Sequence, residues 1–470
     1  MSSEFEFKEV LSRKSKVAYG SANTAGNILS GMVFSAITFY YHIKIGLDAQ
    51  LIGIAWLIFA FWNAFNDPLF GYIEDRTKSD LGRRTPYVRY GAPVFGLLFI
   101  LCWIPLVDIS NEFALFLYFL FILFAFDTIF TIVVLILYVL PAEMALTSKE
   151  RANLMVYAIL IGALGYVVTY IVPVLLLTGN ESTGLDPTFI SVMIIIGIAC
   201  SLIIFISSYF LKEYKFAQIE EPLGPVKAVK ECFKNKPFLT FEIAAFCGTI
   251  ATTILTTAMF YYIDYVLDLE GVMTIVPILT VILMVFIFAY AVSKLVEKKG
   301  LKKVLISGQI IAGIAFILFF FFGWNFVAAI FCFILLGIAL SISTILAPLL
   351  LADTIDFDET RTNKRRETTY TGIEALINKP AISIANWLFL FVISLYGFQE
   401  AAKNQSESAI MGIMIGIALI PAIFVFLSAL IMKFYTLDGP EWAEQKLKLQ
   451  RVHEEKEKEY IKYLKEQGKI

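Results

Sequence analysis

The chain has 470 residues, of which 59% are hydrophobic and only 17% are charged. Soluble domains carry about a quarter charged residues, so this composition is typical of an integral membrane protein. The net charge of -2 gives no indication of nucleic-acid binding, and two histidines with five irregularly spaced cysteines exclude a His- or Cys-based metal site.

Long apolar runs follow one another along the whole chain. A helix needs about 20 apolar residues to cross the hydrocarbon core of a bilayer. Runs of this kind predict an all-α integral membrane protein with twelve transmembrane helices, centred on 17–42, 50–73, 88–107, 113–140, 153–177, 188–211, 238–263, 272–296, 303–323, 325–351, 369–396 and 408–434.

Basic residues gather in every second loop. The loops that follow the second and eighth spans are rich in Lys and Arg, whereas the alternate loops hold only Lys44 and Lys403. Because basic loops stay on the cytoplasmic side, both termini are predicted to be cytoplasmic. We therefore expect a multi-pass protein of the cell membrane, with the lipid bilayer as its main partner and no obligate protein partner.

A polar segment with Pro222 and Pro225 divides the spans into six and six. This predicts an N-terminal six-helix half at 1–211, a cytoplasmic linker at 212–237, a C-terminal six-helix half at 238–435 and a charged cytoplasmic tail at 436–470. The two basic loops occupy corresponding places in the two halves. Such internal repetition is typical of transporters with a central site between two pseudo-symmetric halves.

Four charged residues inside predicted spans are candidates for a functional role: Asp67, Asp127, Glu374 and Lys379. A charge at the bilayer centre costs about 2.5–3.5 kcal/mol on insertion scales and usually marks a functional site. Asn63, Asn66 and Asp67 share one helix face. Our hypothesis is that Asp67 is the central coupling carboxylate and that Lys379 opposes it across the two halves. The alternative for each charge is a buried ion pair that locks two helices together.

Further charges lie at the predicted cytoplasmic ends of the spans. We expect a cytoplasmic gate formed by Asp75, Arg76, Arg83, Arg84, Glu143, Arg151, Asp353 and Arg366. Single exposed ion pairs contribute less than about 1 kcal/mol, so several must act together to close one side.

Two motifs point to a known family. The first comprises Asn66-Asp67-Pro68, Gly71, Asp75-Arg76-Thr77 and Gly82-Arg83-Arg84-Thr85-Pro86-Tyr87, and the second runs from Leu351 to Asp358 and continues at Lys364-Arg365-Arg366-Glu367. They resemble motifs of the glycoside–pentoside–hexuronide cation symporters, the melibiose-carrier branch of the major facilitator superfamily. The resemblance covers nearly the whole chain and implies the major facilitator fold and alternating access.

The resemblance also suggests roles for single residues. Of the two helix 2 aspartates that bind the cation in the melibiose carrier, the first corresponds to Asn63 here and the second to Asp67. One carboxylate fewer favours H⁺ over Na⁺ as the coupling ion. The family lysine of helix 11 corresponds to Lys379. No cofactor is expected, and the only metal would be a transported Na⁺.

The family's sugar-contacting residues are altered in this chain. The helix 1 aspartate corresponds to Asn27, the helix 4 aspartate to Val133, and the helix 5 arginine to Ile159. Asp127, nearly two turns before Val133, could replace the helix 4 carboxylate. We therefore expect Asn27, Asp127 and Lys379 to contact the substrate.

Several functions remain open at this point. The leading one is cation-coupled symport of a sugar, glycoside or related polar solute. The alternative is facilitated transport of an amphipathic substrate such as a lysophospholipid or an organic anion. A membrane sensor or scaffold would have no use for costly interior charges. An integral-membrane enzyme is the least favoured class, because the sequence offers no nucleophile–base pair, metal-ligand cluster or glycine-rich phosphate-binding loop.

Overall fold

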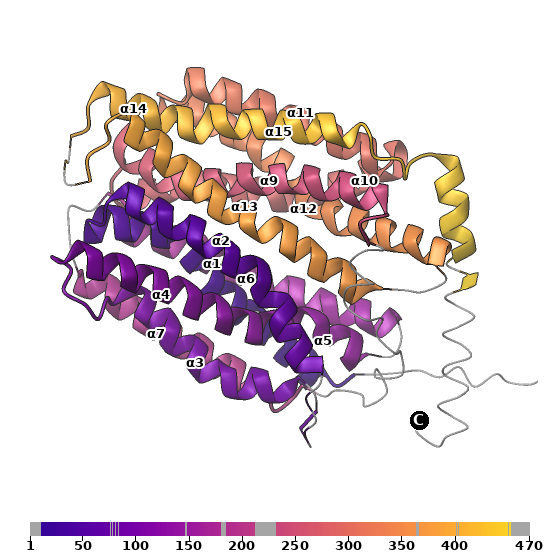
Figure 1. Cartoon of the computed structure of the whole chain (residues 1–470). Helices are drawn as coiled ribbons and strands as arrows, with labels where there is room; N and C mark the ends of the chain where they lie inside the picture. The colour runs from indigo at the N-terminus through magenta and orange to yellow at the C-terminus, as the bar shows by residue number, and fades with distance from the viewer. Residues whose placement is uncertain are drawn as a thin grey trace, which may run out of the picture.

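The computed structural model (Figure 1) describes residues 11–75, 77, 79, 81–82, 84–145, 148–179, 185–211, 232–362, 366–400, 402, 404–449 and 451–452. Within these residues, twelve helices are long and apolar enough to cross a membrane. They coincide with the twelve predicted spans, so the predicted all-α fold with twelve transmembrane helices is confirmed. Most of the predicted linker at 212–237 lies outside the described residues, and α9 begins at Lys236, within the last two residues of that linker.

The N-terminal half contains α1 (Arg13–Phe39), η1 (Tyr40–Ile45), α2 (Ala49–Asp75), α3 (Thr85–Trp103), α4 (Glu112–Phe130), η2 (Thr131–Leu135), α5 (Ile136–Met144), α6 (Ser148–Leu177) and α7 (Pro187–Ser207). The C-terminal half contains α9 (Lys236–Tyr261), η3 (Tyr262–Val266), η4 (Gly271–Ile275), α10 (Val276–Lys299), α11 (Leu301–Phe322), α12 (Phe326–Thr362), α13 (Glu367–Leu395), α14 (Glu407–Met414), η5 (Ile415–Leu419) and α15 (Ile420–Met432).

Polar residues fix where several spans begin. The side chains of Ser12, Asn111 and Asn235 accept hydrogen bonds from backbone N–H groups three residues later, at 3.1, 3.1 and 3.2 Å. Such caps satisfy N–H groups that have no partner within the helix. The spans themselves need no amphipathic pattern, because their outer faces contact lipid and only their inner faces pack against protein.

The two halves lie side by side along the bundle (Figure 1). Across their interface α2 packs against α13, and α1 packs against α9. Within the N-terminal half α3 packs closely on α7, where a Cβ atom on Gly96 would lie only 2.9 Å from the carbonyl oxygen of Gly197. The interface helices α1, α2, α9 and α13 therefore border any central site between the halves.

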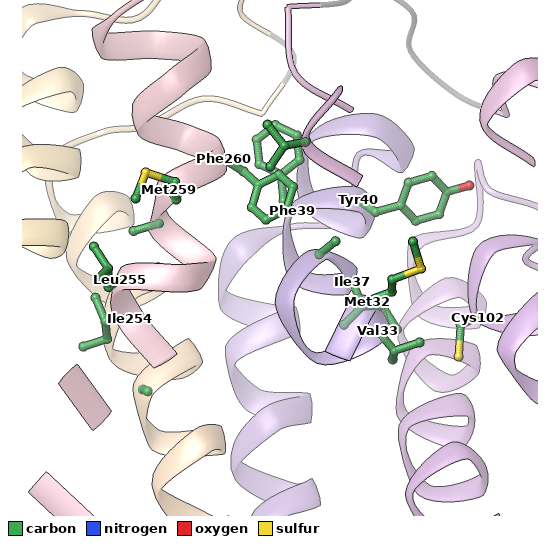
Figure 2. Close-up of a cluster of buried hydrophobic side chains, with 14 of the residues drawn as sticks. Met32, Val33, Ile37, Phe39, Tyr40, Cys102, Ile254, Leu255, Met259 and Phe260 are labelled. Carbon is green, nitrogen blue, oxygen red and sulfur yellow. The ribbon is translucent and has the colours of Figure 1, made fainter. Parts of the chain in front are cut away.

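Contacts between the halves are dense at the end of the bundle where α1 passes into η1, called here the outer end. Phe39 of α1 stacks on Phe260 of α9, with ring centroids 5.4 Å apart (Figure 2). Nearby, Thr38 Oγ1 donates a hydrogen bond to Asn386 Oδ1 at 2.8 Å. His42, which is fully buried, lies with Nδ1 2.8 Å from the Tyr261 hydroxyl. These aromatic and polar contacts close the halves against each other at the outer end.

At the opposite end of the bundle, where α1 begins, three ion pairs between described residues each lie within one half. This end is called the basic end. Lys16 of α1 pairs with Glu150 of α6 at 2.7 Å, and Arg366 pairs with Asp358. Lys446, in a helix at residues 440–449 that follows α15, pairs with Asp353 of α12 at 2.5 Å. These ion pairs stabilise each half separately.

Candidate functional site

The central site begins with one face of α2. Asn63, Asn66 and Asp67 are three and four residues apart and therefore share a helix face, and they are 2%, 0% and 4% exposed. This face is directed toward α4 and α13, the helices that provide its partners. Three polar side chains are thus buried at the interface between the two halves.

Lys379 of α13 reaches this face from the C-terminal half. Its Nζ lies 2.5 Å from Asp67 Oδ1 and 3.6 Å from Asp127 Oδ1 of α4. Nζ also lies 5.3 Å from the centre of the Phe130 ring. The Lys379 side chain is 16% exposed, and an ammonium that is largely removed from water needs a compensating charge, which two carboxylates supply here. The sequence hypothesis that Lys379 opposes Asp67 across the halves matches this geometry.

Thr131 completes the cluster and was missed by the sequence analysis. Asn66 Nδ2 donates to Asp127 Oδ2 at 2.7 Å and to Thr131 Oγ1 at 2.8 Å, and Thr131 Oγ1 donates to Asp67 Oδ1 at 2.7 Å. A hydrogen-bonded chain therefore connects the two carboxylates. Thr131 follows Asp127 by four residues, and this spacing could have indicated from the sequence that Thr131 belongs to the cluster, because residues four apart share a helix face.

Thr131 is also the first residue of η2, a π-helical segment within the fourth span. Single π-helical turns are often found at functional sites, where the wider turn redirects side chains. The π-turn lies where α4 faces α2, so it positions Thr131 between Asn66 and Asp67. We refer to Asn63, Asn66, Asp67, Asp127, Thr131 and Lys379 as the central cluster.

Several oxygens of the central cluster are buried and have no hydrogen-bond donor among the residues that the structure describes. These are Asn63 Oδ1, Asn66 Oδ1, Asp67 Oδ2 and Asp127 Oδ1. Buried acceptors normally have a donor or a cation, so a proton, a small cation or a substrate hydroxyl would satisfy them. With both carboxylates ionised and Lys379 protonated, the cluster carries one negative charge. It is therefore suited to bind one positive charge. Among the described residues no group of three His, Cys, Asp or Glu side chains forms a metal site.

Asn27, the other residue expected to contact substrate, lies on α1. Its Oδ1 accepts a hydrogen bond from the Tyr138 hydroxyl of α5 at 2.7 Å. The structure thus brings Asp127 and Lys379 together and gives Asn27 a separate partner within the N-terminal half.

The residues of the expected gate are only partly described. Arg76, Arg83 and the side chains of Asp75 and Glu143 lie outside the described residues. Arg84 is 5% exposed at the start of α3, and Arg151 Nε donates to the carbonyl oxygen of Ala145 at 3.3 Å. Their joint role as a gate stays a prediction.

The other two gate residues have partners within the C-terminal half and its tail. Asp353 accepts hydrogen bonds from Trp442 Nε1 at 3.1 Å and from Lys446 Nζ at 2.5 Å. Arg366 donates to Asp358 through Nε at 2.9 Å. In this conformation both residues stabilise the C-terminal half rather than linking it to the other half.

A buried carboxyl group outside the central cluster was also missed. Glu242 of α9 is fully buried, and its Oε2 accepts a hydrogen bond from Asn378 Nδ2 of α13 at 2.8 Å. Glu242 lies inside the predicted span 238–263, so the criterion that selected Asp67 would have selected it too.

The arrangement of the spans and of the central cluster defines the class of protein. Twelve spans in two halves, with an acid–base cluster buried between them, are the arrangement of a major facilitator transporter. A solved structure described as a D-xylose–proton symporter superposes with a TM-score of 0.63 and 14% identity, covering 90% of this chain and 96% of that one. At this identity the match establishes the fold.

Sequence comparison gives the family. The model of the MFS/sugar transport protein family matches residues 18–439, and the chain belongs to this family. It is thus a multi-pass membrane transporter and not an enzyme. Among its relatives is the symporter YnaJ of Bacillus subtilis (strain 168), described as uncharacterized, with 26% identity and 97% of each chain covered. Another is a glucuronide carrier protein homolog of Escherichia coli (strain K12), with 23% identity over 92% of this chain and 94% of the relative.

Proposed function

We propose that the protein is a symporter that couples the inward movement of H⁺ to the uptake of a sugar, glycoside or related polar solute. The observation that carries this proposal is the ion pair between Lys379 of one half and Asp67 of the other. The substrate class is supported by the glucuronide carrier homolog among the relatives.

The charge balance of the central cluster supplies the mechanism. Asp67 and Asp127 compete for Lys379, at 2.5 and 3.6 Å. Protonation of one carboxylate makes the cluster neutral and weakens the attraction between the halves. Because a ligand shifts a conformational equilibrium only through its different affinity for the two states, a proton that is bound more tightly in one state drives the change.

The preference for H⁺ rests on the ligand set. Hard metal cations prefer several oxygen ligands, with carboxylates prominent among them. Asn63 provides an amide oxygen at the position where the resemblance to the melibiose carrier implies a second helix 2 carboxylate, and Asp127 is already paired with Lys379. A proton needs only one carboxylate and no coordination shell.

The proposed orientation follows the basic loops, with the basic end in the cytoplasm. The outer end, which is closed by the contacts of Phe39 and Thr38, is then extracellular. This conformation would be the inward-facing one. The charged residues of the expected gate would pair across the halves only in the outward-facing state.

Uptake into proteoliposomes tests the proposal. Purified protein is reconstituted and supplied with labelled glucuronides, pentosides, other glycosides or a lysophospholipid, with either an imposed pH gradient or an imposed Na⁺ gradient. We expect concentrative uptake of one sugar class with acid outside, abolished by a protonophore. Uptake driven only by Na⁺ would contradict the coupling ion, and uptake of the lysophospholipid alone would contradict the substrate class.

A further inference from the structure

Glu242 lies in the C-terminal half, outside the central cluster. It is six residues after the start of α9 at Lys236, about 9 Å along the helix axis. Its side chain is fully buried, and its only described hydrogen-bond partner is Asn378 of α13. The transport chemistry of the central cluster does not involve Glu242.

The contact between Glu242 and Asn378 uses one of two possible hydrogen bonds. Asn378 Nδ2 donates to Glu242 Oε2 at 2.8 Å. The remaining oxygens, Glu242 Oε1 and Asn378 Oδ1, are both buried and have no hydrogen-bond partner among the described residues. Both are acceptors when Glu242 is ionised, so neither can satisfy the other.

A single proton on Glu242 would join the two unpartnered oxygens, Glu242 Oε1 and Asn378 Oδ1, in one hydrogen bond. A protonated carboxyl group is a donor at one oxygen and an acceptor at the other, and a side-chain amide has the same two functions. With the proton on Oε1, Glu242 can donate to Asn378 Oδ1 while Oε2 continues to accept from Nδ2. The two groups then form a closed pair of hydrogen bonds.

The charges around Glu242 favour the protonated form. Helices α1, α12, α13 and α15 pack against α9, and α15 has no charged residue. Among the described charged groups Glu374 of α13 acts on Glu242, and it carries the same sign. The buried or partly buried basic groups beside α9 are paired with carboxylates, in Lys16–Glu150, Lys446–Asp353, Arg366–Asp358 and Lys379–Asp67. The other described basic groups of α1, α9 and α12 are exposed, namely Arg13, Lys14, Lys236 and Arg361. An ionised Glu242 would therefore be buried without a countercharge, which proteins avoid.

We propose that Glu242 and Asn378 form a proton-binding site in the C-terminal half, separate from the central cluster. Asn378 directly precedes Lys379 on α13, so a movement of α13 relative to both α2 and α9 separates Lys379 from Asp67 and Asn378 from Glu242 together. The proton then passes from Glu242 Oε1 to water and leaves a solvated carboxylate. This link to the transport cycle rests on the proposed function, whereas the protonated state of Glu242 does not.

Infrared spectroscopy of the purified protein in lipid nanodiscs tests the site without any substrate. A protonated carboxyl group has a C=O stretching band that is absent from a carboxylate. We expect such a band near neutral pH in the wild type and its loss in Glu242→Gln, whose amide keeps the pairing with Asn378. Glu374→Gln and the exposed control Glu407→Gln should keep the band.

Three results would overturn the proposal. The band could be the same in Glu242→Gln, it could disappear in Glu374→Gln instead, or Na⁺ at constant pH could remove it in the wild type. If Glu242→Gln does not fold, Asn378→Ala provides the second test. Loss of the hydrogen bond should shift the band to higher frequency, and an unshifted band would contradict the pairing. Because no transport is measured, failure of this site and failure of symport are distinguishable.

Discussion

Replacing Asp67 by Asn should uncouple transport without unfolding the protein. At an effective dielectric constant of about 20, Coulomb's law gives about 7 kcal/mol for the Lys379–Asp67 pair at 2.5 Å and about 5 kcal/mol for Lys379–Asp127 at 3.6 Å. Desolvation offsets much of both values. In Asp67→Asn, Lys379 therefore keeps a partner, and the cluster is neutral before any proton binds.

We expect Asp67→Asn to lose proton-driven accumulation of substrate and to keep substrate exchange. If one proton enters with each substrate, a gradient of about one pH unit drives about tenfold accumulation in the wild type. In Asp67→Asn this accumulation should fall to equilibration, while exchange of internal for external substrate persists. Asp108→Asn makes the same chemical change at an exposed loop position and should behave as the wild type. Concentrative uptake by Asp67→Asn would refute the coupling role.

Three further predictions concern stability and are measured by thermal unfolding of purified protein. Asn66→Leu removes the donor that links the central carboxylates and should cost about 1–3 kcal/mol; an unchanged melting temperature would contradict this. The His42 hydrogen bond holds the pKa of Glu400 below its ordinary value. This stabilisation is present at neutral pH and is lost as the pH falls through the lowered pKa. The wild type should therefore lose more stability in acid than Glu400→Gln. Equal losses in the two proteins would contradict a stabilising His42–Glu400 hydrogen bond. Gly96→Val should lower the melting temperature by overpacking against Gly197, a cost of about 1–3 kcal/mol; wild-type stability would disprove the close approach.

The spans and the main charged pair were predictable because the bilayer constrains the sequence strongly. Apolar runs of about 20 residues are uncommon outside membrane spans, and an interior charge such as Asp67 or Lys379 requires a partner. The position of Thr131 was harder to predict. A π-turn inserts one residue into a helix and depends on packing against neighbouring helices, which local sequence does not record.

The partners of the gate residues could not be derived from the sequence. The distribution of basic residues indicates which side of the membrane a loop occupies, but not which charge a given residue contacts. Asp353 pairs with Lys446, which is 93 positions away in the tail. Arg366 pairs with Asp358 of the neighbouring helix instead of with the other half. Only the fold brings these residues together.

Proton movement during substrate entry is the most direct test of the central claim. Proteoliposomes without any imposed gradient are suspended in weakly buffered medium, and an effective sugar or glycoside is added outside while the external pH is recorded. Symport with H⁺ predicts that the medium becomes more alkaline as substrate enters, that a protonophore abolishes the change, and that Asp67→Asn gives none. Substrate entry at constant external pH in the wild type would contradict proton coupling through the central cluster.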